Sequence, residues 1–420
     1  MEINLAQLKG NCECGRNHSI TTKTIIIEPH AIERILDVTE ALELKSMGCI
    51  ICDTNTKPYA DAVAEKLSAN LYIHKPVIVL EAGGLETSDK CVQEAEAEIS
   101  PYVSWLVAAG SGTVHTITRF LANKMKIPFV SFPTAASTDG FAGTVNTMFW
   151  HGYVKTFTGI APLAVIADTD IFMGAPYRST AAGISETLGK YMALGDWQCG
   201  RLFLNEPFCD RIYELVKTAV DSVFDNLPAI HAGDVEAYET LMLSLLMSGV
   251  AMQMWGDSRP VSGGERQLAQ FWDMCVINPK PAALQGEKIG VGLLTALRHC
   301  EKVLQISSPE RKALEYDGMP QSVIKSKFGS MFETILKENQ PDPMKSITPE
   351  MMVEKFPGLK QIVSSMPSVR KLRPYMQAAG CVTKMEGIGL SNEIIPDSLL
   401  LAPFVRRRFT IMRVLKLLKI

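Results

Sequence analysis

Two glycines at the end of an apolar run are the first feature of this sequence with the chemistry of a ligand site. Gly110 and Gly112 close the run WLVAAGSG and stand before a helical pattern that begins near Thr113. Because glycine has no Cβ, backbone N–H groups at such a turn can approach a pyrophosphate at the N-terminus of a helix. Turns of this kind are common in α/β proteins, so the feature needs support from elsewhere.

Two further segments give that support. Asp53 ends the apolar run GCIICD, where a carboxylate can accept hydrogen bonds from ribose hydroxyls and repel the extra phosphate of NADP, or can simply cap a helix. Small and hydroxylated residues fill the segment from Thr134 to Gly143, and its one acid, Asp139, is expected where two domains meet. Together these segments predict a dinucleotide site that prefers NAD(H).

A third cluster contains metal-ligating side chains. Cys12, Cys14 and His18 lie within seven positions near the N-terminus. Three soft ligands can contribute to a zinc site, but a fourth is missing from the segment and the C-x-C spacing is not that of a common zinc knuckle. An ordered loop without metal is the alternative.

The elements that must position these residues alternate between strands and helices in the first half of the chain. Six near-continuously apolar runs, typical of strands covered on both faces, occur between residues 23 and 170. They are TIIIEP, GCIICD, KPVIVLE, WLVAAGSG, IPFVSFPT and LAVIADTDI. Helical patterns such as PYADAVAEKLSAN separate them, which predicts an open, doubly wound parallel sheet of Rossmann-like type.

The second half is predicted to be helical. After Pro176 the β-branched runs give way to segments rich in Leu, Met and Ala, such as YETLMLSLLMSGVAMQMW. Glycine and proline in FMGAPYRST mark the change. We therefore expect an α/β dinucleotide-binding domain over residues 1–175 and an all-α domain over residues 176–420.

Composition excludes several classes of function. The 420 residues are 47% hydrophobic and 21% charged with a formal net charge of −3, so the chain can bury two cores and has no basic footprint for nucleic acid or a membrane surface. The arginine run 406–408 fits a helix end or a solvated face better than a binding patch. Cys49, Cys52 and Cys275 occur in apolar segments typical of reduced thiols. We expect no apolar stretch to approach the roughly twenty residues of a membrane span, and we expect a cytoplasmic protein, for which a homodimer is a compatible assembly.

Taken in order, six motifs resemble one known family. They are ICDTNT, GSGTVHTITRF, IPFVSFPTAASTDGF, GKYMALGDW, DSRPVSGGE and QGEKIGVG, and they run from about residue 45 to the C-terminus. The chain is similar to the glycerol-1-phosphate dehydrogenases and their bacterial relatives of the AraM type, within the dehydroquinate synthase-like and iron-containing alcohol dehydrogenase fold. This resemblance implies NAD(P)-dependent interconversion of glycerol 1-phosphate and dihydroxyacetone phosphate, with the dinucleotide between the domains and a divalent metal holding the substrate oxygens.

Carried over by position, the resemblance also implies which residues bind. The dinucleotide contacts would be Asp53, Gly112, Thr113, Val114, His115, Thr116, Thr134, Ala135, Ala136, Ser137 and Gly143. To these we add Gly110 from the turn itself. Asp139 corresponds to an acid that contacts substrate. The sequence departs from the family at Thr116, usually Asp, and at Gly143, often Ser.

The positions of the family's metal ligands are substituted. An Asp and two His residues hold the metal in the family, and the matching positions here are Glu186, Arg266 and Gln285; a further substrate-contacting His corresponds to Gln270. Arginine keeps its charge and offers no lone pair, so we expect no divalent metal at this site. The Arg266 guanidinium is predicted to pair with Glu186 and replace the ion, either as part of an active site or as an ion pair filling an inactive one.

Three other residues of these motifs have two interpretations each. Lys190 can contact a phosphate or pair with Glu186, Arg259 can bind an anion or tie down its loop, and Glu287 is expected to complement the dipole at a helix N-terminus.

The sequence therefore leaves two functions open. One is a metal-independent, NAD-dependent dehydrogenase acting on a small phosphorylated or otherwise anionic polyol or carbonyl compound, with Asp139, Glu186, Arg266 and Gln270 in its active site. The other is a relative that binds a dinucleotide or metabolite and catalyses little, or that uses NAD in a different reaction.

Overall fold

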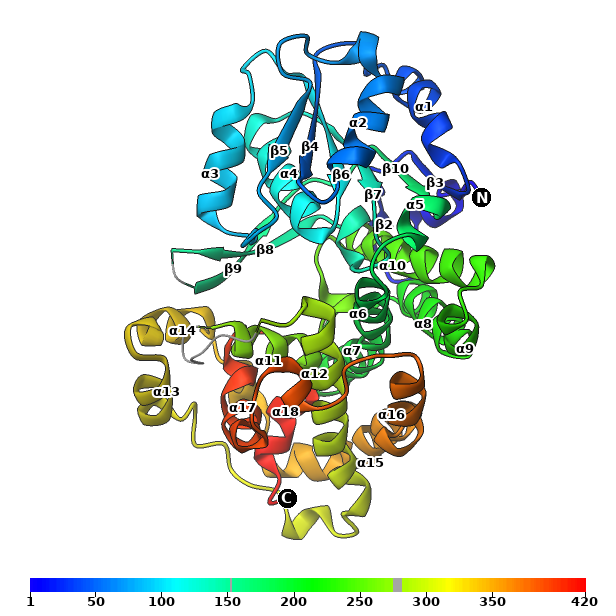
Figure 1. The fold of residues 1–420 in the computed structure, drawn as a ribbon. Coiled ribbons are helices and arrows are strands. Elements are labelled where there is room, and N and C mark those ends of the chain that lie inside the picture. Colours follow the sequence, from blue (N-terminus) through cyan, green and yellow to red (C-terminus); the bar gives the residue numbers. More distant parts are fainter. Residues whose placement is uncertain (152, 275–281) are drawn as a thin grey trace. The chain divides into compact units, whose positions relative to one another are not determined.

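The computed structural model describes residues 1–151, 153–274 and 282–420, so Cys275 lies outside the described part (Figure 1). The chain divides into two compact units. Unit 1 comprises Met1–Thr187 and Asp221–Ser258, and unit 2 comprises Leu188–Val220 and Arg259–Ile420.

A six-stranded parallel sheet forms the centre of unit 1. Its strands are β3 (Thr24–Glu28), β4 (Gly48–Asp53), β5 (Val77–Leu80), β6 (Trp105–Gly110), β7 (Phe129–Pro133) and β10 (Ala164–Asp168). They lie in the order β3-β10-β7-β6-β4-β5. All six coincide with the apolar runs, so the doubly wound sheet predicted from the sequence is confirmed.

Helices cover both faces of this sheet, which explains why its strands are apolar on both sides. On one face, α1 (Ile35–Ala41) and α2 (Lys57–Lys66) pack on a core that contains Ile50 and Val107. On the other, α3 (Asp89–Glu98) and α4 (Gly112–Met125) pack on a core that contains Ile51 and Leu106 (Figure 1). Consecutive strand residues thus alternate between two cores.

Two hairpins of unit 1 were not expected from the sequence. One joins β1 (Gly10–Asn11) to β2 (Asn17–His18), and the other joins β8 (Val145–Trp150) to β9 (Tyr153–Thr158). In β8, burial alternates along the strand, with Asn146 and Met148 buried between partly exposed neighbours. Polar and apolar residues do not alternate in VNTMFW or YVKTFT, so period-2 alternation could not have identified this hairpin.

The remaining helices of unit 1 are α5 (Thr169–Met173), α6 (Tyr177–Leu188), α9 (Leu227–His231) and α10 (Val235–Trp255), and α8 (Asp210–Asp225) contains the point at which the chain re-enters this unit. Unit 1 therefore differs from the predicted domain 1–175, because its first segment continues to Thr187 and it also contains Asp221–Ser258. The reason is packing: α10 lies against β3, α5 and the 3-10 turn η4 (Asp139–Ala142), and a Cβ on its Gly249 would lie 2.7 Å from the carbonyl carbon of Ala142.

Helix α10 also corrects the expectation about apolar stretches. With 21 residues it is, among the described residues, the one helix long and apolar enough to cross a membrane. Of its most apolar window, 72% is buried, and it packs on the elements just named. Its apolar character on all sides is that of a core helix.

Unit 2 is built of helices, as predicted, and its described residues contain no strand. Besides the first part of α8, its helices are α7 (Lys190–Leu204), α11 (Gly264–Asp273), α12 (Gln285–Cys300), α13 (Gln321–Phe328), α14 (Phe332–Glu338), α15 (Pro349–Ser365), α16 (Val369–Ala378), α17 (Ile395–Leu401) and α18 (Ile411–Val414). The closest packing joins α11 to α12, where a Cβ on Gly292 would lie 2.6 Å from the carbonyl oxygen of Glu265. The absence of Cβ at Gly292 lets the two helices approach.

Candidate functional site

The residues predicted to bind a dinucleotide gather at one edge of the sheet. Asp53, Gly110 and Pro133 end the adjacent strands β4, β6 and β7, whose carboxyl ends point the same way. The chain proceeds from β4 outward to β5 and then returns to the other side of β4 with β6. Ligands of open α/β sheets bind at such a reversal of strand order, beyond the carboxyl ends.

Asp53 holds the turn between β4 and α2 and retains an available oxygen. Its Oδ1 accepts hydrogen bonds from the backbone N–H groups of Asn55 and Thr56, both at 2.9 Å, immediately before α2. The Thr56 hydroxyl donates to the carbonyl oxygen of Ala109 at 3.1 Å, which joins the ends of β4 and β6. The N-cap of α2 is Thr56, so the interpretation of Asp53 as a helix N-cap is wrong. Oδ2 of Asp53 is available for a ligand, because the bonds formed within the described residues use Oδ1.

The turn from β6 into α4 packs so closely on its neighbours that positions 110 and 112 have no room for a side chain. A Cβ on Gly110 would lie 2.8 Å from Cβ of Val114, and one on Gly112 would lie 2.7 Å from Cγ2 of Thr138. The N-cap residue, Ser111, makes no capping hydrogen bond with its side chain. The first N–H groups of α4 are thus left for an anion, with the helix dipole favouring negative charge.

Side chains in the first turns of α4 point into the protein rather than outward. Val114 and His115 are fully buried, and the hydroxyl of Thr116 donates to the carbonyl oxygen of Gly112 at 2.9 Å. The imidazole of His115 lies 2.8 Å from Oγ of Ser131 through Nε2 and 3.0 Å from the carbonyl oxygen of Ser111 through Nδ1. In this run, backbone groups are therefore the ones placed to contact a dinucleotide.

Burial lowers the pKa of His115 to about 3, which predicts a pH effect on folding. The unfolded imidazole titrates near 6.5, so the stabilisation is complete above that pH and is lost as the pH falls from 6.5 toward 3. At pH 5 the loss should be about 2 kcal/mol of the free energy of unfolding. Urea unfolding at pH 7 and pH 5 measures it. His115→Gln should remove that part of the pH dependence, and equal slopes in both proteins would contradict a buried, neutral His115.

A buried arginine, which the sequence did not reveal, forms hydrogen bonds that fix the small-residue segment 134–143 after β7. Arg119 of α4 is fully buried and donates from Nη2 to the carbonyl oxygen of Gly140 and from Nη1 to Oδ1 of Asn146 at 3.4 Å. Burial lowers its pKa to about 10, and the charge of Asp139 acts against this, so Arg119 stays cationic. Its position on the inner face of α4 gives no signal beyond helical spacing.

Within this segment, Ala135, Ala136 and Asp139 are buried, whereas Ser137 is half-buried. The Thr138 hydroxyl accepts a hydrogen bond from the N–H of Gly140 at 3.3 Å and caps η4. At the end of the segment, a Cβ on Gly143 would lie 2.8 Å from Cε of Met252 in α10. The small residues are thus required by close packing of the chain on itself as well as being suited to a ligand.

Helix α6 fixes the other side of the same segment. A Cβ on Gly183 would lie 2.0 Å from the carbonyl oxygen of Ala136, so the helix and the segment touch through their backbones. One turn further along α6, Glu186 is fully buried. Unit 1 therefore brings Asp53, the start of α4 and the segment 134–143 to one edge, with Glu186 on an adjoining helix.

Unit 2 carries the other predicted residues on α11 and α12. Arg266 and Gln270 are one turn apart on α11, Gln285 is the first residue of α12, and these two helices pack together. Arg266 and Gln285 are half-buried, and Gln270 is 2% exposed. Both polar side-chain atoms of Gln270 are buried without a hydrogen-bond partner in the described part of the chain. A buried amide of this kind is suited to a ligand.

The turn that starts α11 is held by a buried acid whose importance the sequence did not reveal. Oδ2 of Asp196 accepts from the N–H of Gly264 at 2.7 Å, and Oδ1 accepts from the N–H of Ile411 at 2.6 Å. Burial raises the pKa of Asp196 to about 7. Asp196 therefore positions the helix that carries Arg266 and Gln270.

Two of the remaining interpretations are confirmed. Arg259 donates to both carboxylate oxygens of Glu206 at 2.5 and 2.7 Å, which is the structural role. Glu287 accepts from the N–H of Leu284 at 2.7 Å and caps α12. Lys190 is buried, and its charge lowers the pKa of Glu265 against the larger effect of burial, which raises it.

Elsewhere, unit 1 contains a group of potential metal ligands. Candidate ligand atoms of Cys12, Cys14 and His18 all lie within 4.8 Å of one another. The expectation that the chain holds no divalent metal is therefore not supported.

Comparisons with known proteins agree with this architecture. Residues 26–176 match the family described as iron-containing alcohol dehydrogenase. The glycerol-1-phosphate dehydrogenase (NAD(P)+) of Geobacillus thermodenitrificans is 28% identical over 414 residues, covering 97% of this chain and 96% of that protein. The one from Bacillus licheniformis is 34% identical over 285 residues, covering 67% and 71%.

Solved structures show the same fold at lower identity. Maleylacetate reductase from Agrobacterium tumefaciens matches with a TM-score of 0.60 at 13% identity, covering 92% of this chain and 90% of that one. The archaeal halo-thermophilic Red Sea brine pool alcohol dehydrogenase ADH/D1 matches with a TM-score of 0.62 at 15% identity, covering 94% and 93%. With its six parallel strands, its helical second unit and relatives of up to 34% identity, the chain belongs to the glycerol-1-phosphate dehydrogenase family of the iron-containing alcohol dehydrogenases.

Proposed function

We propose that this protein is an NAD(H)-dependent oxidoreductase that acts on a CH–OH group of a small phosphorylated or otherwise anionic polyol, or on the corresponding carbonyl compound. The observation that carries the proposal is the start of α4, where glycines at the reversal of strand order leave the helix N-terminus open to an anion. The relatives named as NAD(P)+-dependent glycerol-1-phosphate dehydrogenases support the class of reaction.

In this proposal the dinucleotide is bound by unit 1. The backbone from Gly112 to Thr116 takes the pyrophosphate, and Oδ2 of Asp53 takes the ribose hydroxyls. The segment Thr134–Ser137, with Gly143 beyond it, lies along the nicotinamide half. These roles use the groups that the structure leaves available: backbone N–H groups, one carboxylate oxygen and small side chains.

Asp53→Asn should weaken the preference for NADH over NADPH about tenfold. Asparagine keeps an Oδ1 acceptor for the N–H groups of Asn55 and Thr56 but loses the charge that repels a 2′-phosphate. Fluorescence titration with both dinucleotides measures the ratio of dissociation constants. Tighter binding of NADPH than of NADH by the wild type would contradict the assigned role of Asp53.

The donor set at the family's metal positions does not fit a divalent cation. Glu186 alone is an ordinary ligand there; Arg266 cannot give up its proton, and Gln285 offers a neutral amide oxygen. We therefore derive no step through a metal at these positions. In its place, the Arg266 guanidinium supplies a fixed positive charge and planar donors, which suit a carbonyl oxygen, a phosphate or a carboxylate.

The reaction requires hydride transfer and proton transfer. When bound, NADH would supply the hydride that a carbonyl carbon accepts. Arg266 would stabilise the negative charge on the carbonyl oxygen, and the amide of Gln270 would orient the substrate by hydrogen bonding. Asp139, buried in η4, positions the substrate or delivers the proton. Without a metal, turnover of glycerol 1-phosphate itself should be slow.

The test is a panel of phosphorylated ketones and aldehydes, dihydroxyacetone phosphate included, mixed with the purified chain and NADH. We expect oxidation of NADH by at least one compound, at a rate that a chelator leaves unchanged in the wild type and in a Cys12→Ser/Cys14→Ser variant. Arg266→Ala should reduce the rate at least a hundredfold. The triple variant Arg266→His, Gln270→His and Gln285→His should gain chelator-sensitive turnover.

Two results would overturn this proposal. Loss of activity on chelation in both the wild type and the cysteine variant would place a catalytic metal at the substituted positions. Tight NADH binding without oxidation by any compound would instead favour a protein that binds dinucleotide and catalyses little.

A further inference from the structure

The N-terminal hairpin presents its cysteines on a tight turn. In the loop between β1 and β2, the N–H of Cys12 donates to the carbonyl oxygen of Arg16 at 3.0 Å, and the N–H of Gly15 donates to that of Cys12 at 3.0 Å. Gly15 has a φ of +80°, which favours glycine. The loop is thus a defined structure that holds Cys12 and Cys14 near His18.

The imidazole is already oriented as a ligand would be. Sγ of Cys14 lies 3.4 Å from Nε2 of His18, and about 3.5 Å separates sulfur and nitrogen ligands in a tetrahedral zinc site. The other ring nitrogen, Nδ1, lies 2.9 Å from the carbonyl oxygen of Met254. A backbone carbonyl that accepts a hydrogen bond from Nδ1–H keeps the proton on that nitrogen and the Nε2 lone pair facing the Cys14 thiol, which is the usual support of a metal-bound histidine.

We propose that Cys12, Cys14 and His18 bind a zinc ion that stabilises the N-terminal hairpin of unit 1. Two thiolates and one neutral imidazole are ordinary zinc ligands, and together with Zn²⁺ they carry no net charge. Arg16 fixes the same loop by donating to the carbonyl oxygen of Trp255 at 3.0 Å. No step of the proposed reaction uses this ion.

Metal content tests the zinc proposal. Purified protein, dialysed against a weak chelator, should contain about one zinc ion per chain, as measured by inductively coupled plasma mass spectrometry. Cys12→Ser/Cys14→Ser should contain none. Cys91→Ser, which removes a buried cysteine of α3, is the matched control and should keep it.

A second measurement uses the wild type, in case the variants fail to fold. Iodoacetamide should leave Cys12 and Cys14 unmodified until a strong chelator is added. Absence of zinc from the wild type, or alkylation at equal rates with and without chelator, overturns the proposal.

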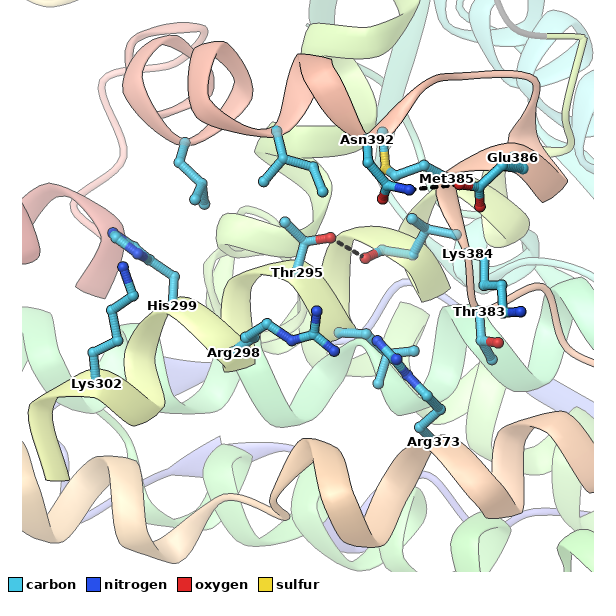
Figure 2. Close-up of a pocket in the computed structure, with 14 residues that line it drawn as sticks. Thr295, Arg298, His299, Lys302, Arg373, Thr383, Lys384, Met385, Glu386 and Asn392 are labelled. Carbon is cyan, nitrogen blue, oxygen red and sulfur yellow. Dashed lines mark hydrogen bonds between the residues drawn. The ribbon is translucent and has the colours of Figure 1, made fainter. Parts of the chain in front are cut away.

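An independent observation concerns a cavity in unit 2. About 560 Å³ of space lies beside α12, α16 and the segment 383–386 (Figure 2). Its lining includes the cationic side chains of Arg298, Lys302, Arg373 and Lys384. Figure 2 shows the guanidinium groups of Arg298 and Arg373 side by side at its centre.

These charges have no described counterions. No ion pair involves any of the four cations in the described part of the chain, and Nε of Arg373 is buried there without a hydrogen-bond partner. Burial lowers the pKa of Arg373, and the charge of Arg298 lowers it further. The one acid in the lining, Glu386, accepts a hydrogen bond from Asn392 at 2.5 Å. Like charges gathered in a cavity favour an anion that can bridge them.

We infer that this cavity binds a small phosphorylated metabolite, at a site separate from the substituted family positions. The probe is pyrophosphate, added to protein saturated with NADH so that the dinucleotide site is filled. We expect micromolar binding by calorimetry, reduced at least thirtyfold in Arg298→Ala/Arg373→Ala. Lys337→Ala/Lys345→Ala, which removes two cations outside the cavity, is the control.

Equal binding by the cavity variant and the wild type, or no binding by the wild type, overturns this inference. The variant changes side chains on the cavity wall, and its thermal unfolding midpoint without ligand checks that the fold is kept.

Discussion

Gly112→Ala should lose NADH binding, and the loss should persist when the space for the new methyl group is restored by a second substitution. In the single variant the added Cβ meets Cγ2 of Thr138 at 2.7 Å, so packing is strained as well. Thr138→Ser removes that methyl group and keeps the hydroxyl that caps η4 through Gly140. We expect the double variant to unfold within about 1 kcal/mol of the wild type and to bind NADH at least thirtyfold more weakly, about 2 kcal/mol.

The double variant should still bind NADH weakly because the new methyl group remains near the N-terminus of α4. With Thr138 shortened, the methyl group added at position 112 still occupies the approach to the first N–H groups of α4, where the pyrophosphate is proposed to bind. Fluorescence titration and urea unfolding of the wild type, both single variants and the double variant separate the two effects. Wild-type affinity in the double variant would show that Gly112 is required by Thr138 and that the cofactor has been placed wrongly.

Gly183→Ala should destabilise the protein strongly, although it adds only one methyl group. Its Cβ would lie 2.0 Å from the carbonyl oxygen of Ala136 and 3.2 Å from Cα of Ser137, both backbone atoms that no side-chain rotation can move. We expect a loss of about 3 kcal/mol in the free energy of unfolding, even though alanine favours a helix by about 1 kcal/mol over glycine. Because the segment 134–137 must shift, NADH affinity should fall as well.

Gly358→Ala is the matched control for this prediction. That glycine is also helical, in α15, and its Cβ would meet the end of the Leu202 side chain at 3.0 Å, which can rotate away. It should change the free energy of unfolding by less than about 1 kcal/mol. A wild-type unfolding midpoint for Gly183→Ala would mean that α6 does not fix the segment after β7.

The sheet edge that we propose to bind the dinucleotide was largely predictable because it depends on local features. Strand ends, glycines and small residues are visible in sequence, and parallel strands bring their carboxyl ends to one edge whatever the details of packing. Asp53 illustrates the limit of this reasoning. The sequence suggested a helix N-cap or a ribose ligand, and only the hydrogen bonds from Asn55 and Thr56 show that its Oδ1 holds the turn before α2.

Side-chain direction was not predictable in the same way. His115 follows the glycine turn immediately and was expected to contact the dinucleotide, but its ring is buried between α4 and β7. Arg119, one turn later, supports the segment 134–143 from inside the unit. A helix places neighbouring residues about 100° apart, so which of them face inward depends on where the helix packs.

By itself, the sequence determined the six strands, the change to helices after residue 176 and the motifs of the family. Each of these is encoded in residues near one another in the chain. Tertiary structure alone decided that residues 221–258 return to unit 1 and that Gly183 meets Ala136. These depend on contacts between distant segments, whose free energy comes from packing and burial and leaves little trace in local composition.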